Sequence, residues 1–255
     1  MLNLIGDILN WVAAGILFPV LFIPLARLLG GKTATWIATV TAVVLIGIAF
    51  AYLVPILRVV PSPNQLIVFG SCFAFLSSVI QISGGLEKFS DRTVTAAEKF
   101  VRGTGNLVMW LLIIMALVQF GIVVLRYVFG INKIYMQESI TYLHGTVFML
   151  AGGYALLTND HVRVDIFYGE APEKRKALID FLGTYFLLFP VCLLLLWTAS
   201  PYVGNSWAVS EGSPQGSGIH AVFLLKSLIP AFALLMILAG FSIASRAAET
   251  LKGLR

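Results

Sequence analysis

Seven stretches of the sequence are strongly apolar, and each is close to the length of a membrane-crossing helix. The hydrocarbon core of a bilayer needs about 20 consecutive apolar residues in one helix. The stretches that meet or approach this length are Leu4–Ala26, Ala34–Leu57, Gln65–Ile82, Gly105–Leu125, Ser139–Leu157, Ala177–Ala199 and Ala221–Ala244. This pattern predicts an all-α, polytopic integral membrane protein with about seven transmembrane helices.

The first and third stretches require separate arguments. Gln65–Ile82 is short and carries three serines and Gln81, so a re-entrant segment is an alternative to a full crossing. The first stretch contains Asp7 and has no lysine or arginine before Arg27, whereas a signal peptide starts with a basic segment. We therefore expect the first stretch to be a transmembrane helix.

The composition agrees with lipid as the main solvent of this chain. Of its 255 residues, 59% are hydrophobic and only 11% are charged, whereas a soluble domain carries about 25% charge. This excludes a large soluble enzyme and a disordered chain. The net charge of +5 does not indicate nucleic acid, because the basic residues lie between the apolar stretches and form no stripe with aromatic residues. Both cysteines lie inside apolar stretches, without the spacing of a disulfide scaffold or metal site.

Lysine and arginine are distributed unevenly over the two sides of the membrane. With seven helices and alternating loops, thirteen of the 17 basic residues fall on one side and four on the other. Cytoplasmic loops carry the excess of basic residues. The sequence therefore predicts an outer N-terminus and a cytoplasmic C-terminus. A re-entrant third stretch would leave the orientation of the last four helices unchanged.

The segment Leu86–Arg102 has apolar residues near the helical period, with charged residues opposite them. This pattern predicts an amphipathic helix that lies in the headgroup plane on the cytoplasmic side, with its basic residues towards anionic lipid. A solvated connector is the alternative. The chain then divides into a three-helix N-terminal extension (1–85), the interfacial helix (86–103) and a four-helix part (104–255).

Few polar side chains are expected deep in the membrane, although a self-sufficient transporter needs ionisable residues there. The deepest candidates are Gln119, His144 and Lys226. We interpret His144 as structural, with a proton relay as the alternative. A haem with two histidine ligands would need a second histidine at this depth, and His161 and His220 fall in or beside loops. No catalytic or phosphate-binding motif is found, so the sequence predicts no enzyme activity.

Lys226 lies about five residues inside the last predicted helix, on the outer side. A lysine at this depth must snorkel or form a pair. Because Glu138 and Glu211 are expected on the same side, we predict a contact between Lys226 and a glutamate, in this chain or in a partner. Snorkelling alone is the alternative. We expect Glu138 itself to lie in the first turn of its helix, where the helix dipole favours a carboxylate.

Further polar and small residues border the last four predicted helices. Arg126 can snorkel from the end of its helix. His161 and Asp165 alternate with apolar residues, as in a short extended or interfacial segment. Trp207 is expected at interface depth in the outer loop before the last helix. Gly152 and Gly153 allow close helix approach, within this chain or with a partner.

The stretch from about Gly105 to Arg255 resembles the small permease subunit of tripartite ATP-independent periplasmic (TRAP) transporters. The positions that carry the resemblance are, in order, Arg126, Tyr127, Phe129, Glu138, Ala151, Gly152, Gly153, His161, Arg163, Asp165, Pro172, Trp207, Glu211, Ser213, Pro214, Lys226 and Pro230. Each motif is short, so the resemblance rests on their order and spacing. Two features depart from the family: Tyr135-Met-Gln-Glu138 stands where Trp-x-Glu-Glu is frequent, and the N-terminal extension lies outside the minimal four-helix subunit.

The resemblance implies a non-catalytic subunit of a sodium-driven transporter in the bacterial inner membrane. Its implied partners are a large permease subunit, which binds substrate and sodium and moves by an elevator-like shift, a periplasmic substrate-binding protein, and membrane lipids. The small subunit would hold the large one in place. No cofactor is implied in this chain, and sodium is expected in the large subunit. The subunit-interface or structural candidates are Arg126, Glu138, Gly152, Gly153, His161, Asp165, Trp207, Glu211 and Lys226.

Two other classes of function compete with this interpretation. A self-sufficient transporter needs a midplane site formed by broken helices, and Pro55 and Pro190 are the residues that would break them. A membrane anchor for an enzyme or respiratory complex would have His144 as its only candidate ligand. The scarcity of ionisable residues at depth favours the small-permease hypothesis. The transported substrate, commonly an organic acid in such systems, is expected to be selected by other chains.

Overall fold

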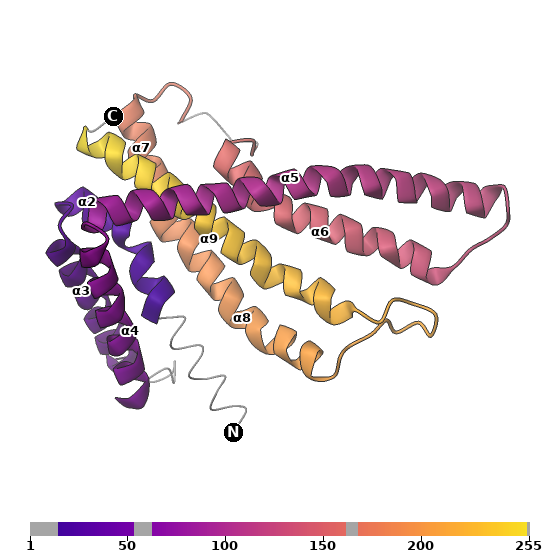
Figure 1. The fold of residues 1–255 in the computed structure, drawn as a ribbon, viewed down its shortest axis with the longest axis horizontal. Helices are drawn as coiled ribbons and strands as arrows, with labels where there is room; N and C mark the ends of the chain where they lie inside the picture. Colours follow the sequence, from indigo (N-terminus) through magenta and orange to yellow (C-terminus); the bar gives the residue numbers. More distant parts are fainter. Residues whose placement is uncertain (1–14, 54–62, 162–167, 254–255) are drawn as a thin grey trace. The chain divides into compact units, whose positions relative to one another are not determined.

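A computed structural model of the chain describes residues 15–53, 63–161 and 168–253 (Figure 1). Most of these residues are helical, with no strand among them. After a first helical segment at residues 15–21, the helices are α2 (Ile23–Leu29), α3 (Thr33–Leu53), α4 (Pro63–Ile82), α5 (Leu86–Tyr127), α6 (Ile134–Thr158), α7 (Glu173–Gly183), η2 (Thr184–Leu188), α8 (Phe189–Ala208) and α9 (Val222–Lys252). The prediction of an all-α protein is confirmed.

Five helices are long and apolar enough to cross a membrane. They are Gln65–Ile82 within α4, then α5, α6, the continuous helix Glu173–Ala208, and α9. These five contain the predicted spans from the third to the seventh. The first two predicted spans are described in part, as the apolar helices Gly15–Leu29 and Thr33–Leu53. The described residues thus form a polytopic membrane protein.

The first predicted span differs from a single straight helix in its described part. The helix through residues 15–21 ends in a turn at Phe22, and α2 begins at Ile23. Pro24 lies in the first turn of α2, where a missing backbone N–H costs no intrahelical hydrogen bond. The break places Arg27 in a short second helix instead of at the end of a long one.

The 42-residue helix α5 contains both the amphipathic segment predicted at Leu86–Arg102 and the fourth predicted span. At 1.5 Å per residue it extends about 63 Å, roughly twice the thickness of the hydrocarbon core. The predicted amphipathic helix is therefore helical, but it continues into the span without a break. Helix α5 continues through Gly105. The missing side chain of this glycine lets the ring of Tyr154 in α6 pack against the α5 backbone.

Pro190, Pro201 and Pro230 lie inside the long helices Glu173–Ala208 and α9. Pro190 follows η2, a π-helical segment whose wider hydrogen-bonding pattern lets the chain pass a residue without an N–H. Pro201 and Pro230 lie inside α8 and α9. The broken helix that Pro190 would indicate is thus not found, and Pro55 lies outside the described residues. The described helices give no support to a midplane site of the kind that a self-sufficient transporter needs.

The chain forms two compact units, which we describe separately. Unit 1 comprises Met1–Thr95, Glu173–Leu178 and Ala244–Arg255. At its centre Trp36 of α3 is fully buried, and its Nε1–H donates a hydrogen bond to the Pro19 carbonyl at 2.9 Å. The Trp36 ring also lies 5.1 Å from the ring of Phe73 in α4. One tryptophan thus joins the first helical segment, α3 and α4.

Unit 2 comprises Ala96–Pro172 and Ile179–Ile243. Its core includes Val101 of α5, Leu157 of α6, and Leu235 and Ala239 of α9. Many large apolar side chains of the same helices are exposed, and Phe120, for example, is 70% exposed. A soluble protein rarely exposes such extended apolar surface. Lipid is therefore the natural solvent of these faces.

Candidate functional site

The carboxylate of Glu138 fastens the loop between α8 and α9 to α6. Its Oε1 accepts a hydrogen bond from the Ser213 hydroxyl at 2.5 Å, and its Oε2 accepts one from the Ile219 backbone N–H at 2.6 Å. The prediction that Glu138 lies in the first turn of its helix is wrong, because α6 begins four residues earlier, at Ile134. The carboxylate binds a distant loop instead of the end of its own helix.

Lys226 of α9 forms a salt bridge with Glu211 of the same loop, with 2.5 Å between Nζ and Oε2. The ammonium also lies 4.1 Å from the centre of the Tyr202 ring in α8. The prediction of a Lys226–glutamate contact is confirmed, and the partner is within this chain. The hydrogen bond from Lys226 lowers the pKa of Glu211, which lies outside the membrane-spanning helices. We call Glu138, Glu211, Ser213, Ile219 and Lys226 the loop clasp.

Trp207 adds a further contact between the end of α8 and the start of α9. Its Nε1–H donates to the Ser227 hydroxyl at 2.8 Å, and its ring packs edge-on against Phe223 at 4.7 Å. Trp207 was expected in the outer loop, but α8 continues to Ala208 and includes it. The loop is thus shorter than predicted, and aromatic contact draws its two ends together.

The arrangement of the loop clasp is suited to holding helix ends in place and not to acid–base catalysis. Both carboxylates already accept hydrogen bonds from donors in this chain, and Lys226 is paired. A general acid or base needs access to a substrate proton within hydrogen-bonding reach. Because the clasp residues bind one another, their evident role is to fix the ends of α6, α8 and α9.

Gly152 and Gly153 form a close seam between α6 and α9. A Cβ atom at Gly153 would lie 2.8 Å from the Leu235 Cβ and 3.0 Å from the Leu235 backbone, and a Cβ at Gly152 would lie 2.6 Å from the Phe232 ring. Small residues permit this backbone approach in membrane proteins. The two glycines therefore pack within the chain. His161, after the end of α6, approaches the Gly152 carbonyl with its Nε2 at 3.4 Å.

The other predicted site residues are not brought into these clusters. Arg126 is exposed at the end of α5, with its guanidinium 5.8 Å from the centre of the Tyr127 ring. Gln119 and His144 are also exposed. Asp165 lies outside the described residues, as does most of the segment predicted to be extended or interfacial after His161.

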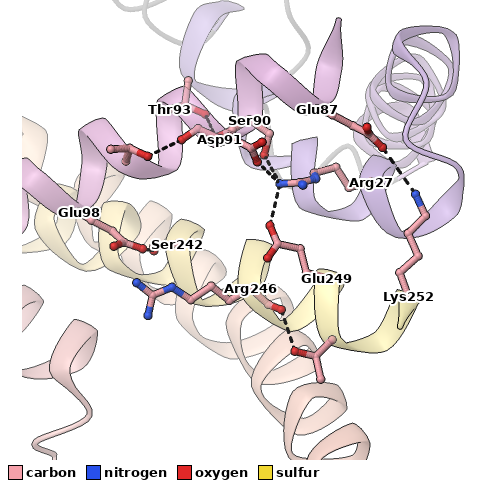
Figure 2. Close-up of polar contacts among 12 residues, drawn as sticks. Arg27, Glu87, Ser90, Asp91, Thr93, Glu98, Ser242, Arg246, Glu249 and Lys252 are labelled. Carbon is pink, nitrogen blue, oxygen red and sulfur yellow. Dashed lines mark hydrogen bonds and ion pairs between the residues drawn. The ribbon is translucent and has the colours of Figure 1, made fainter. Parts of the chain in front are cut away.

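Unit 1 contains a charge cluster around the buried side chain of Arg27, which sequence reasoning missed (Figure 2). Arg27 of α2 binds the Ser90 hydroxyl at 2.9 Å and the Asp91 carboxylate at 3.0 Å, both in α5, and Glu249 of α9 at 3.2 Å. We call these four residues the Arg27 cluster. The side chain of Arg27 is only 10% exposed. In the sequence, Arg27 served only to predict the membrane orientation. Its position at the end of an apolar stretch also indicated that the charge would need partners if it were buried.

Two further polar contacts link α5 with α9. Lys252 of α9 approaches Glu87 of α5 at 4.0 Å in unit 1, and the Ser242 hydroxyl donates to Glu98 in unit 2 (Figure 2). Within the described chain, no group of three or more histidine, cysteine, aspartate or glutamate side chains is arranged to hold a metal ion. The polar clusters thus join helices to one another.

Comparison with known proteins identifies the family of this chain. The sequence model of one family, described as the DctQ component of tripartite ATP-independent periplasmic transporters, matches residues 115–250. No curated protein and no solved structure matches the chain. The matched segment includes the whole loop clasp and Glu249, whereas Arg27, Ser90 and Asp91 precede it. Because the match covers more than half of its length, the chain belongs to the DctQ family and is a small permease component of a TRAP transporter.

Proposed function

We propose that this chain is the non-catalytic scaffold subunit of a sodium-driven TRAP transporter that takes up an organic acid or a similar solute. Membership of the family makes it the small component, which works with a large permease and a substrate-binding protein. In our proposal the large permease binds sodium and solute and moves, whereas this subunit stays fixed and supports it. Solute capture belongs to a separate periplasmic protein.

The loop clasp is the observation that carries this proposal. It fixes the ends of α6, α8 and α9 through Glu138, Glu211 and Lys226, and the glycine seam packs α6 directly against α9. Packed interfaces of this kind resist continuous deformation. Unit 2 is therefore suited to support a moving partner and not to move solute itself.

The distribution of ionisable groups supports the same division of labour. Transporter sites are lined by ionisable or polar groups near the bilayer midplane, commonly at interruptions of helices. Among the described spans, Glu138 and Lys226 lie near helix ends and are engaged in the loop clasp, and His144 is the ionisable residue closest to the middle of α6. A single imidazole is a poor basis for sodium binding, because sodium in transporters is coordinated by backbone carbonyls at helix interruptions.

We further propose that the protein lies in the bacterial inner membrane, with the N-terminus and the α8–α9 loop on the periplasmic side and the C-terminus on the cytoplasmic side. The distribution of lysine and arginine supports this orientation. The α8–α9 loop would then face the compartment in which the substrate-binding protein circulates.

Reconstitution tests the proposal. Proteoliposomes would contain this chain alone, the large permease alone, or both, with the solute-loaded binding protein outside and an inward sodium gradient. We expect uptake only with both membrane subunits, and loss of uptake when the sodium gradient is removed. Sodium-driven uptake by this chain without the large permease would refute a scaffold role.

A further inference from the structure

Four exposed residues form a line along the N-terminal part of α6, and three of them are polar. Gln137, Thr141, His144 and Phe148 are exposed, whereas the remaining residues of α6 from Glu138 to Thr158 are buried or half-buried. Their spacing of four, three and four residues places them on one narrow face of a helix. We call these four residues the α6 stripe.

The opposite side of α6 is already occupied within unit 2. Gly153 packs on Leu235 of α9, and Tyr154 packs on Gly105 of α5. Glu138, next to Gln137 in sequence, fixes the start of the helix to the α8–α9 loop. In Figure 1, α6 lies beside α5 and α9. The α6 stripe is therefore presented outward on a helix whose position is fixed.

The depth of His144 makes lipid an unfavourable neighbour for the stripe. His144 lies five residues after Ser139, where the apolar span of α6 begins, which corresponds to about 8 Å along the helix axis. Its ring stacks on Phe148, 6.3 Å away, and among the described residues no hydrogen bond to the imidazole is found. A polar side chain that faces acyl chains at this depth loses its hydrogen bonds to water without replacement.

We propose that the α6 stripe is the docking surface for a transmembrane segment of the large permease, which offers a hydrogen-bonding group to His144. This inference rests on the proposed function, because the family supplies a polytopic membrane partner of this chain. The stripe has the properties of such a surface: it is narrow, fixed in position, polar at its centre, and bordered by Phe148, which is 68% exposed. Hydrogen-bonding side chains join helices across such contacts in membranes.

Photo-crosslinking in the purified, intact transporter tests the position of the partner. A benzophenone amino acid would replace Phe148 in the stripe or Phe120 in α5, two exposed phenylalanines of similar accessibility. We expect an adduct with the large permease from position 148 and a much weaker one from position 120. Equal adducts from both positions, or an adduct from position 148 with a second copy of this chain, would overturn the assignment. Intact transporter without any adduct at position 148 would overturn it as well, while the proposed function would stand.

Substitution of His144 tests the hydrogen bond. His144→Leu should reduce the amount of large permease recovered with the tagged chain by roughly threefold to fifteenfold, the range that corresponds to one hydrogen bond between membrane helices. His144→Gln should restore recovery, because glutamine keeps a donor and an acceptor at similar depth. The thermal stability of this chain purified alone should not fall in either variant. Full recovery of the large permease with His144→Leu would contradict the inference. A failure of the wild-type chain to bind any large permease would instead contradict the proposed function.

Discussion

Arg27 of α2 and Glu249 of α9 form an ion pair with 3.2 Å between Nη1 and Oε1, although they lie near opposite ends of the sequence. Arg27 belongs to the N-terminal extension, whereas Glu249 lies in the last helix, inside the segment that matches the DctQ family. The same guanidinium also binds Ser90 and Asp91 at the start of α5. Within unit 1, the buried guanidinium of Arg27 thus joins α2 of the N-terminal extension to the start of α5 and to the end of α9.

Loss of Arg27 is expected to destabilise the attachment of the extension. The substitution removes the hydrogen bond from the guanidinium to buried Ser90 and the ion pair with Glu249, which is 23% exposed, and a hydrogen bond to a charged group contributes about 1.5–3 kcal/mol. The side chain of Arg27 is buried, so Arg27→Ala should lower the thermal midpoint of the protein in detergent by several degrees. The midpoint can be followed by the intrinsic tryptophan fluorescence of the protein, to which Trp36 in the same unit contributes.

Lys32→Ala provides the matched control for Arg27→Ala. Lys32 is an exposed cation five residues further along, between α2 and α3. Its loss should change the thermal midpoint little, since exposed charges contribute little to stability. Equal effects of the two substitutions would show that the Arg27 cluster does not stabilise unit 1.

Gly153→Ala is expected to separate α6 from α9. The new Cβ would lie 2.8 Å from the Leu235 Cβ and 3.0 Å from backbone atoms, which can move only if the helices move. Such overpacking costs about 1–3 kcal/mol. Gly121→Ala in α5 is the control, because nothing lies within 4 Å of a Cβ at that position. Thermal unfolding should show a lower midpoint for Gly153→Ala and an unchanged or higher one for Gly121→Ala. A stable Gly153→Ala variant would be incompatible with the close seam.

The contact between Lys226 and Glu211 is expected to show energetic coupling. Lys226→Gln and Glu211→Gln should each increase cleavage of the α8–α9 loop by protease, because each removes the same salt bridge. The double variant should be cleaved little faster than either single one, since contacting residues have non-additive effects. Ser217→Ala in the same loop serves as a control for local sequence effects. Additive effects of the two glutamine substitutions would mean that the two side chains act independently.

The order of the α8–α9 loop should depend on pH in the acidic range. The hydrogen bond from Lys226 lowers the pKa of Glu211 in the folded protein. The contribution of this contact to stability is therefore complete above the unfolded pKa of about 4.3, and it is lost as the pH falls through the lower folded value. Hydrogen exchange should report constant protection of the loop between pH 8 and about pH 5, with loss of protection below about pH 4. In Glu211→Gln this acidic transition should be smaller; a loss of protection already near pH 6 would point to another group.

The orientation of the protein in the membrane can be tested with single cysteines, each introduced into a variant that lacks Cys72 and Cys192. Gly216→Cys lies in the α8–α9 loop and Lys174→Cys lies at the start of α7. In intact cells with a permeabilised outer membrane, a membrane-impermeant maleimide should label position 216 and not position 174. The reverse pattern would invert the topology proposed from the basic residues.

Hydropathy predicted most of the fold, because helix formation in lipid depends mainly on local apolar length. It also predicted the Lys226–glutamate contact, because a lysine at that depth needs a partner. The role of Glu138 was missed since α6 starts at Ile134, before the apolar residues begin. The continuity of α5 was missed because a change from amphipathic to apolar pattern carries no helix-stop signal, and Gly105 serves packing. The Arg27 cluster joins residues far apart in sequence, and no local pattern specifies such a pairing.

The composition of the purified complex tests the central claim most directly. The tagged chain would be isolated from its native membrane in mild detergent and analysed by native mass spectrometry. Our account predicts a complex that contains this chain and a large polytopic permease in equal amounts. A homo-oligomer of this chain without a large permease would contradict the scaffold role and return attention to a self-sufficient transporter.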